Sequence, residues 1–500
     1  MRIKKIDILV KIPPIVAVCS GAVFSFYGFK TCIQNGLSNF ITASILCALA
    51  CISALFVLRK KINKLLFLLL VCFFAGIICG IAGRTSVLKE NFVSLGQVSE
   101  NVTGLTGILR DDPRTSSSGN GMGTVGLIQS LGKNGIRTSA RGNILVFFPE
   151  GSIPRLKEFG RNSVIFVDGN FSVPKNGTSD IKIFRAKSTH IYKSAPFLDR
   201  LRTQCRLAVV DVFSAGKEKW GGLALALLLG IRDNLDSDLA KQYQNAGCSY
   251  ILALSGMHLA IISAVLAFLL TKPLGKIKGT VLSAVFIFLY VYIVGDQPSL
   301  TRSAIMYMLG TFAVVCAFPK SPAILLALSF LLQIFYYSAQ GDTISFILSY
   351  LALAGILSVG PALTFIGKGK IPDIILSPLS ASLGAFLATV SICILFFGEL
   401  APGGIAAGLL LAPLTTVFMV LAMGYLFFAF TIPVLNIPLK FVMSLVYTFL
   451  DRIAAFFGKF PSLKLAPDFF VMSISILLPL SIILLALYTK RKRHFIELEH

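Results

Sequence analysis

The chain has 500 residues, of which 55% are hydrophobic and 14% charged, with a formal net charge of +23 and a mean hydropathy of +0.81. This composition excludes an ordinary soluble protein. Apolar runs of about 20 residues, long enough to cross a bilayer as a helix, recur along the chain. We predict a polytopic α-helical membrane protein with about ten to twelve membrane helices, some of them broken or re-entrant. The predicted spans are residues 13–31, 39–58, 64–83, 248–271, 277–295, 301–318, 322–338, 343–366, 376–397, 405–430, 436–457 and 469–489.

Short basic clusters beside these spans predict the topology. They are "RIKK" (2–5), "RKKINK" (59–64) and "KRKRH" (490–494), and under the positive-inside rule all three lie in the cytoplasm. We expect both termini to be cytoplasmic in a multi-pass protein of the cytoplasmic (inner) membrane. We interpret the first span as an uncleaved anchor, because no small-residue cleavage site follows and two more spans come at once. These three spans form a predicted N-terminal unit, residues 1–95.

The cysteines and histidines predict no metal centre. None of the ten cysteines shows CxxC spacing, none lies between residues 97 and 195, and neither HExxH nor HxHxDH occurs. The sequence therefore indicates neither a disulfide framework nor a structural zinc site, and we expect no cofactor.

Residues 96–195 form a predicted β-domain. Short β-type segments at 102–110, 123–130, 142–148, 162–173 and 181–192 alternate with turn signals. Five strands joined by loops of uneven length favour a small Greek-key barrel, with an OB-like fold as the leading candidate. The third span carries the chain outward, so we expect this domain outside the cytoplasm. A basic OB barrel is a platform for single-stranded nucleic acid, although many such barrels bind none; the candidate DNA-binding residues are Lys133, Arg137, Arg141, Arg155 and Lys157.

The third predicted unit, residues 196–500, is a membrane helical bundle that opens with irregular segments. Residues 197–220 are basic and amphipathic, which suits a helix lying in the membrane interface, and Trp220 stands where interfacial aromatics usually occur. The apolar run 221–230 is too short to span, and the polar residues 231–250 separate it from the next apolar helix. We predict a re-entrant or broken element here.

The segment "LALSGMH" (252–258) places Ser255, Gly256 and His258 in an apolar stretch. Three interpretations remain open. Ser255 and His258 could be a hydrolase pair, although no G-x-S-x-G elbow and no orienting acid are evident. Ser255 and Gly256 could be small packing residues with His258 hydrogen-bonded between helices. His258 could also face a polar pathway, since an ionisable residue inside a membrane bundle is a functional suspect.

Two further segments interrupt the apolar pattern. In "GDQPSLTRSAIM" (295–306), Asp296 and Arg302 either belong to a loop with a snorkelling arginine or flank a pore mouth, where Arg302 meets a phosphate or carboxylate. In "GDTISFILSYLALAG" (341–355), Ser349 belongs to a mildly polar stripe that is most simply explained by helix packing. Glycine- and proline-interrupted spans are typical of transporters and channels.

Together these segments resemble the ComEC-type competence proteins, polytopic channels that pass single-stranded DNA across the cytoplasmic membrane in natural transformation. The resemblance covers roughly residues 97–455 and includes the order of spans, β-domain and competence bundle. Matching positions are Gly230, Arg232, Ala246, Gly247, Leu252, Ala253, Ser255, Gly256 and His258, then Gly295, Ser299, Arg302 and Met306, and then Ser345, Phe346, Leu348, Ser349 and Gly355. Two departures stand out. The chain lacks the metallo-β-lactamase-like domain that many members carry at the C-terminus, and Gly408 stands where asparagine is common.

The resemblance implies a channel for single-stranded DNA, and not an enzyme. The channel or pathway residues it implies are Arg232, Ser255, Gly256, His258, Asp296, Arg302 and Ser349. Because the chain has no G-x-x-x-x-G-K-[ST] loop, we expect a separate ATP-driven motor, together with DNA-receptor proteins, membrane lipid and a possible homo-oligomer. The rival hypotheses are a small-anion or proton-coupled transporter using Asp296, Arg302 and His258, and an intramembrane serine hydrolase using Ser255.

Overall fold

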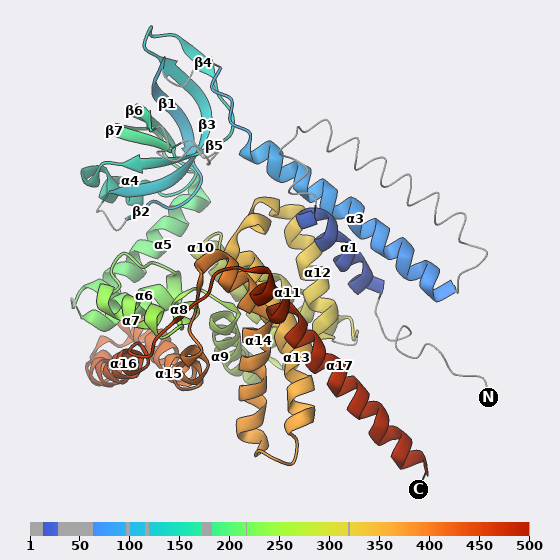
Figure 1. Cartoon of the computed structure of the whole chain (residues 1–500). Helices are drawn as coiled ribbons and strands as arrows, with labels where there is room; N and C mark the ends of the chain where they lie inside the picture. Colours follow the sequence, from blue (N-terminus) through green and yellow to red (C-terminus); the bar gives the residue numbers. More distant parts are fainter. Residues whose placement is uncertain are drawn as a thin grey trace.

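The computed structural model describes residues 14–28, 64–96, 101–115, 120–172, 183–216, 218–318 and 321–499. Two N-terminal helices lead into a region of strands, and a third helix leads from the strands into a large helical bundle (Figure 1). The predicted span at 39–58 lies outside the described residues.

The N-terminal helices α1 (Pro14–Gly28) and α3 (Lys64–Asn91) pack along each other (Figure 1). Their backbones touch where small residues meet: a Cβ on Gly21 would collide with the Phe73 carbonyl, and one on Gly76 with the Val18 carbonyl. Close approach through small residues is the usual way in which apolar helices associate where lipid surrounds them.

The sheet region begins after α3, and its described residues contain seven strands. They are β1 (Val102–Leu109), β2 (Arg114–Thr115), β3 (Gly121–Gly132), β4 (Arg137–Ser139), β5 (Asn143–Phe148), β6 (Val164–Ser172) and β7 (Ile183–Lys193). Alternating side chains such as Ile144, Val146 and Phe148 point into one core, which is what a period of two residues produces. All five predicted strands are confirmed, whereas the short β2 and β4 were not predicted.

The strand pairings of the sheet region return to their starting strand. The order is β1-β6-β7-β5-β3, and β3 also pairs with β1; the β5–β7 pair is parallel and the others are antiparallel. A 3₁₀ turn, η4 (Glu150–Ser152), and the short helix α4 (Ile153–Phe159) connect β5 to β6. Helix α5 (Phe197–Ser214) then leads to the bundle.

The predicted spans within the described residues are mainly helical, and the span 248–271 is interrupted at Ala253–Ser255. The bundle comprises α6 (Lys219–Leu229), α7 (Ser237–Asn245), α8 (Ser249–Leu252), α9 (Gly256–Leu274), α10 (Lys276–Val294), α11 (Pro298–Val315), α12 (Pro322–Tyr336), α13 (Ile344–Gly367), α14 (Asp373–Phe397), α15 (Gly403–Thr431), α16 (Asn436–Phe457) and α17 (Phe469–Glu499). The 3₁₀ turns η5 (Ser338–Asp342) and η6 (Pro433–Leu435), and the strand pair β8 (Glu399–Leu400) and β9 (Leu463–Lys464), complete it.

Seven helices in the described part of the chain are long and apolar enough to cross a membrane. They are Val71–Lys89 within α3, then α9, α10, α13, α14, α15 and the segment Pro433–Phe457. The apolar segments of α6 and α12 are shorter than this length, and the side chains of α1 and α17 are described only in part.

The broken element predicted after residue 220 is present. Helix α6 is buried along nearly its whole length and ends at Gly230, whose φ of +70° is the left-handed conformation that favours glycine. Two short helices follow, and Ala253 and Ser255 are extended immediately before α9 begins. The chain therefore bends sharply at "LALSGMH".

One prediction about the segment 197–220 is wrong, and the position of this helix in the membrane interface stays a prediction. Trp220 is only 3% exposed and packs edge-on against Phe213 and Tyr425 inside the bundle, so it is a core residue and no interfacial anchor. Helix α5 buries the charged side chains Asp199 and Arg202 between the sheet region and α10. Its polar face is a joint between two parts of the protein, which amphipathic periodicity alone does not distinguish from a helix on a membrane surface.

Candidate functional site

Three of the segments singled out in the sequence meet at one buried position, which we call the Arg302 cluster. It contains Gly256 of α9, Ser299, Arg302 and Ser303 of α11, and Ser349 and Tyr350 of α13. The Arg302 guanidinium donates from Nη1 to the Ser349 carbonyl at 3.0 Å and from Nη2 to Ser303 Oγ at 3.3 Å. It also lies over the Tyr350 ring, 5.7 Å from its centroid.

Arg302 is buried without an acidic partner. The residue is only 7% exposed, and its Nε has no hydrogen-bond partner. No carboxylate of the described residues pairs with it. Burying an isolated charge is costly, and in most proteins a counter-ion removes that cost. An anion arriving from outside the chain would have this effect here.

The backbone around Arg302 adds to the positive potential. Helix α9 begins at Gly256, and a Cβ on that glycine would lie 3.0 Å from Arg302 Nη2, so the guanidinium rests against the helix N-terminus. Helix α11 begins at Pro298, one turn before Arg302. The N-terminal end of a helix carries a partial positive charge and is a favourable place for an anion, but an unfavourable one for a cation.

His258 caps the start of α9. Its Nδ1 accepts a hydrogen bond from the Ser255 backbone N–H at 3.2 Å and lies 2.9 Å from Ser255 Oγ. A nitrogen that accepts from an amide carries no proton, so the proton of the neutral ring is assigned to Nε2. That Nε2 is buried and has no partner among the described residues. It is therefore a second free donor near the N-terminus of α9.

The serine–histidine contact lacks the parts of a hydrolase. In a working triad, the second ring nitrogen of the base contacts an orienting acid. Here no acid of the described residues contacts His258, and Nδ1 is already occupied by the main chain beside Ser255. The geometry fits a capping arrangement with one spare donor better than a nucleophile and its base.

A polar network behind the cluster was not recognised in the sequence. Ser349 Oγ donates to Ser299 Oγ at 2.9 Å, and the Tyr350 hydroxyl donates to Gln333 Oε1 at 3.0 Å. Gln333 Nε2 in turn donates to the Pro298 carbonyl at 3.0 Å. Gln333 is a fully buried amide in an apolar helix, and that isolated polar residue was the signal that could have placed α12 beside α11.

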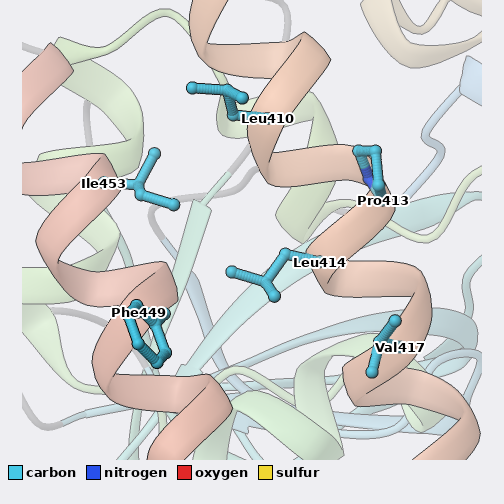
Figure 2. A pocket seen from close by; sticks show the side chains of 6 residues that line it. All are labelled: Leu410, Pro413, Leu414, Val417, Phe449 and Ile453. Carbon is cyan, nitrogen blue, oxygen red and sulfur yellow. The ribbon is translucent and has the colours of Figure 1, made fainter.

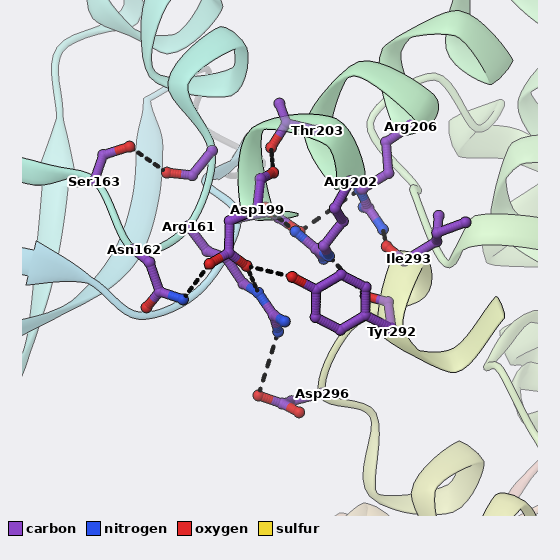
Figure 3. A network of polar contacts seen from close by, with 12 residues as sticks. Arg161, Asn162, Ser163, Asp199, Arg202, Thr203, Arg206, Tyr292, Ile293 and Asp296 are labelled. Atoms are coloured by element: carbon purple, nitrogen blue, oxygen red, sulfur yellow. Dashed lines mark hydrogen bonds and ion pairs between the residues drawn. The ribbon is translucent and has the colours of Figure 1, made fainter. Parts of the chain in front are cut away.

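A second polar network, which we call the seam, joins the sheet region to the bundle (Figure 3). Arg161 Nε donates to Asp199 Oδ1 at 3.2 Å, Asn162 donates to the other oxygen at 3.0 Å, and the Tyr292 hydroxyl donates to Oδ1 at 3.0 Å. Burial acts to raise the pKa of Asp199, but these hydrogen bonds outweigh it and leave the pKa below the ordinary value.

Asp296 belongs to this seam and not to the Arg302 cluster. It lies 3.9 Å from Arg161 Nη1, with its side chain 55% exposed, at the elbow between α10 and α11 (Figure 3). The elbow connects the two networks along the chain, because α11 begins two residues after Asp296. The two side chains therefore belong to different networks. That Asp296 and Arg302 flank one pore mouth stays a prediction.

The remaining candidate residues lie on the outside of the fold. Arg232 is exposed, in the loop after α6, and the neighbouring Asp233 accepts from the Thr115 backbone and pairs with Lys157. This contact ties the loop to the sheet region. Lys157 is thus engaged in an ion pair, whereas Arg155 on the same helix is exposed.

Lys133, Arg137 and Arg141 form a separate exposed group. All three lie in or beside the β3–β4 hairpin, at the end of the sheet region away from the bundle (Figure 1). The structure therefore divides the five predicted DNA-binding residues into a hairpin group and a pair on α4.

The described residues contain no cluster of metal ligands, and they form two surface depressions, of which one is partly polar and lies beside Lys219 and Asp236. No group of three or more His, Cys, Asp or Glu side chains in that part of the chain could hold a metal ion. A depression between α15 and α16 is entirely apolar (Figure 2), and its lining residues are Leu410, Pro413, Leu414, Val417, Phe449 and Ile453. Such a surface suits lipid chains or another apolar helix more than a polar ligand.

The described residues form a mostly helical protein with a buried cationic cluster and an attached sheet region, and seven of their helices are long and apolar enough to cross a membrane. Comparison with known proteins gives the family. A family model described as competence protein matches residues 227–492, more than half of the chain, and the chain belongs to this ComEC-type family. The Arg302 cluster lies inside the matched region.

Two relatives are informative. An uncharacterized protein of Aquifex aeolicus (strain VF5) is 25% identical over 325 residues, which cover 63% of this chain and 74% of the relative. ComE operon protein 3 of Bacillus subtilis (strain 168) is 32% identical over 94 residues, which cover 18% of this chain and 12% of the relative. No solved structure matches the chain.

Proposed function

We propose that this protein is a membrane conduit for single-stranded DNA in natural transformation. Membership of the competence family supports a role in DNA uptake, and the apolar helices support a place in the membrane. The observation that carries the proposal is Arg302, a buried guanidinium without an acid, set against the N-terminus of α9. A passing phosphodiester would supply the missing negative charge.

The sheet region would receive the DNA outside the cytoplasm. Its closed pairing order, with one parallel pair and a helix between the third and fourth long strands, supports a five-stranded OB-like barrel. We propose that the exposed Lys133, Arg137 and Arg141 make the first phosphate contacts, with Arg155 as an additional contact. Because Lys157 pairs with Asp233, its contribution is smaller.

Inside the bundle, the strand would be guided by charge and would undergo no covalent chemistry. Arg232 stands where the sheet region meets the bundle, and Arg302, with His258 Nε2 as a second donor, would hold one phosphate at a time. Gly256 and Ser349 keep the guanidinium in place. Such contacts are independent of base sequence. A separate ATP-driven motor and DNA-receptor proteins would supply energy and cargo, with a possible homo-oligomer as the working assembly and both termini in the cytoplasm.

Replacement of Arg302 by methionine tests this function. If Arg302 exists to bind a phosphate, R302M should abolish uptake of labelled DNA by a complemented deletion strain while leaving the purified protein as stable as the parent or more stable. R302K, which keeps the charge but loses the planar fork, should retain part of the uptake. K459Q, at an exposed lysine, is the control. Normal uptake by R302M at equal protein level would refute the proposal.

A small-anion transporter is the second candidate, because the Arg302 cluster would attract any anion of suitable size. The two functions differ in cargo. Reconstituted vesicles that accumulate inorganic phosphate or chloride through the parent protein but not through R302M, in a strain whose DNA uptake is unaffected by the same substitution, would favour the transporter.

A further inference from the structure

We infer that Arg202 is a positioning residue for the Arg302 cluster, acting by joining the sheet region to the elbow from which α11 starts. The inference rests on the proposed function in that it assigns a purpose to the position of Arg302. Its physical basis, the coupling between two parts of the chain, stands on the contacts of Arg202 alone.

Arg202 is only 1% exposed, and its guanidinium donates to three residues. Nη1 and Nη2 donate to the two carboxylate oxygens of Asp112, in the loop after β1, at 2.9 and 2.6 Å. Nε donates to the Tyr292 carbonyl at 2.8 Å, and Nη2 also reaches the Val294 carbonyl at 3.3 Å. One side chain of α5 therefore connects the sheet region with the last turn of α10.

Arg206, one turn further along α5, strengthens the same connection. Its Nη1 donates to the carbonyls of Ile293 at 3.0 Å and Val294 at 2.7 Å. Burial lowers the pKa of Arg206 to about 10. The nearby charge of Asp112 acts to raise this pKa, and the charge of Arg202 acts to lower it further. Two guanidinium groups thus donate hydrogen bonds to the last carbonyls of α10. Positive charge is favourable at the C-terminal end of a helix.

The elbow itself permits little freedom around this contact. Gly295 has a φ of +96°, and a Cβ on it would lie 2.7 Å from Arg202 Nη2, so the chain turns directly against the guanidinium. Asp296 is held toward Arg161, and α11 begins at Pro298. Arg302 follows one helical turn later. The position of Arg302 therefore depends on the elbow between α10 and α11. Helix α5 and the sheet region hold the α10 end of that elbow in place.

Asp112 is the residue through which the sheet region holds Arg202. Burial would raise its pKa, but the Arg202 hydrogen bonds and the charges of Arg206 and Arg161 outweigh this and keep the pKa below its usual value. Asp112 is therefore a carboxylate at neutral pH. Removing its charge leaves Arg202 buried with main-chain partners only, and breaking one side of a buried pair is strongly destabilising.

D112N is the test, with the neighbouring D111N as a matched control. Spin labels on noncanonical residues at positions 150 in the sheet region and 315 at the end of α11 report the distance between the two parts; both positions are exposed. D112N should at least double the width of the distance distribution and lower DNA uptake about tenfold. D111N should change neither. R202K, which cannot bridge Asp112 and the carbonyls at once, should behave like D112N.

Two outcomes would overturn the inference: a distance distribution unchanged by D112N, or a broadened distribution with normal uptake. Failure of the proposed function is recognised separately. If R302M takes up DNA normally, the conduit proposal fails, while a distribution broadened by D112N and R202K but not by D111N would still establish the coupling.

Discussion

Gly256→Ala is the most direct test of how tightly the Arg302 cluster is packed. The added Cβ would lie 2.8 Å from Ser303 Oγ and 3.0 Å from Arg302 Nη2. Unstrained contacts of carbon with such atoms are about 3.5 Å. The guanidinium must therefore move by about 0.5 Å, away from α9 and along its bond to the Ser349 carbonyl. Ser303 cannot yield freely, since its Oγ donates to the Ser299 carbonyl at 2.9 Å.

The magnitude follows from two opposing effects. Overpacking a close contact costs about 1–3 kcal/mol, whereas replacing glycine by alanine in a helix returns up to about 1 kcal/mol. The free energy of unfolding should thus fall by no more than about 3 kcal/mol, and the protein should fold. The displaced guanidinium should also bind the anion more weakly, and a loss of about 1.4 kcal/mol in binding free energy corresponds to a tenfold lower affinity. We expect uptake to fall about tenfold.

The assay is uptake of labelled DNA by a deletion strain that expresses G256A at the parent level. Gly310→Ala, on the same helix as Arg302, is the matched control, because its Cβ would meet only Leu325 Cδ1 at 3.9 Å. Uptake by G256A equal to that by G310A would refute the tight packing of Gly256 against Arg302 as a requirement for transport.

Three further predictions concern the hairpin, the seam and Ser255. Replacing the hairpin cations by glutamine in the full chain should reduce the slope of log K against log salt for a single-stranded oligonucleotide by about 2, measured by fluorescence anisotropy; an unchanged slope would remove the hairpin from the DNA path. The substituted residues are Lys133, Arg137 and Arg141. Because the pKa values of Asp112 and Asp199 are lowered in the folded protein, the seam contributes stability that is fully present above about pH 4 and is lost as the pH falls through the lowered values. The distribution of distances between spin labels at positions 150 and 315 should accordingly keep its width from pH 7 to about pH 5 and broaden only below about pH 4. A distribution that broadens near neutral pH would contradict the role of these carboxylates. Ser255→Ala should retain most of the uptake, because it removes one contact to His258 Nδ1 and leaves the main-chain bond; complete loss, together with labelling of the parent by a serine-reactive probe, would instead favour a hydrolase.

The helices and the long strands could be predicted because local periodicity determines them. Long apolar runs leave a helix as the favoured structure, and alternating residues such as those of β5 produce a strand with one buried face. The break after Gly230 and the one before Pro298 likewise lie where the sequence indicated them, whereas the break at Ala253–Ser255 falls inside the predicted span 248–271. The length of the predicted span 322–338 was less accurate, since α12 has 15 residues.

The two polar networks could not be predicted, because their members are far apart in the sequence. Arg202 and Asp112 are separated by 90 residues, and Arg302 and Ser349 by 47. Each of these residues, taken singly, is compatible with a solvated charge or a packing serine. Only the packing of α5 on α10, and of α11 on α13, shows which partner each one has. For the same reason the contact of Asp296 with Arg161 could not be predicted.

Arg302 differs from two other buried arginines in having no acidic partner among the described residues. Arg84 donates to both oxygens of Asp342 at 2.6 Å, and Arg202 makes a two-point contact with Asp112. Both arginines are nearly inaccessible, and each has the carboxylate that makes burial of a guanidinium tolerable. Arg302 is buried to a similar degree, and yet its partners are a carbonyl, a hydroxyl and an aromatic ring. Among the described residues, two buried arginines thus have acids and a third lies beside a helix N-terminus, which leaves a place for an anion; under the proposed function that anion is the phosphate of the transported strand.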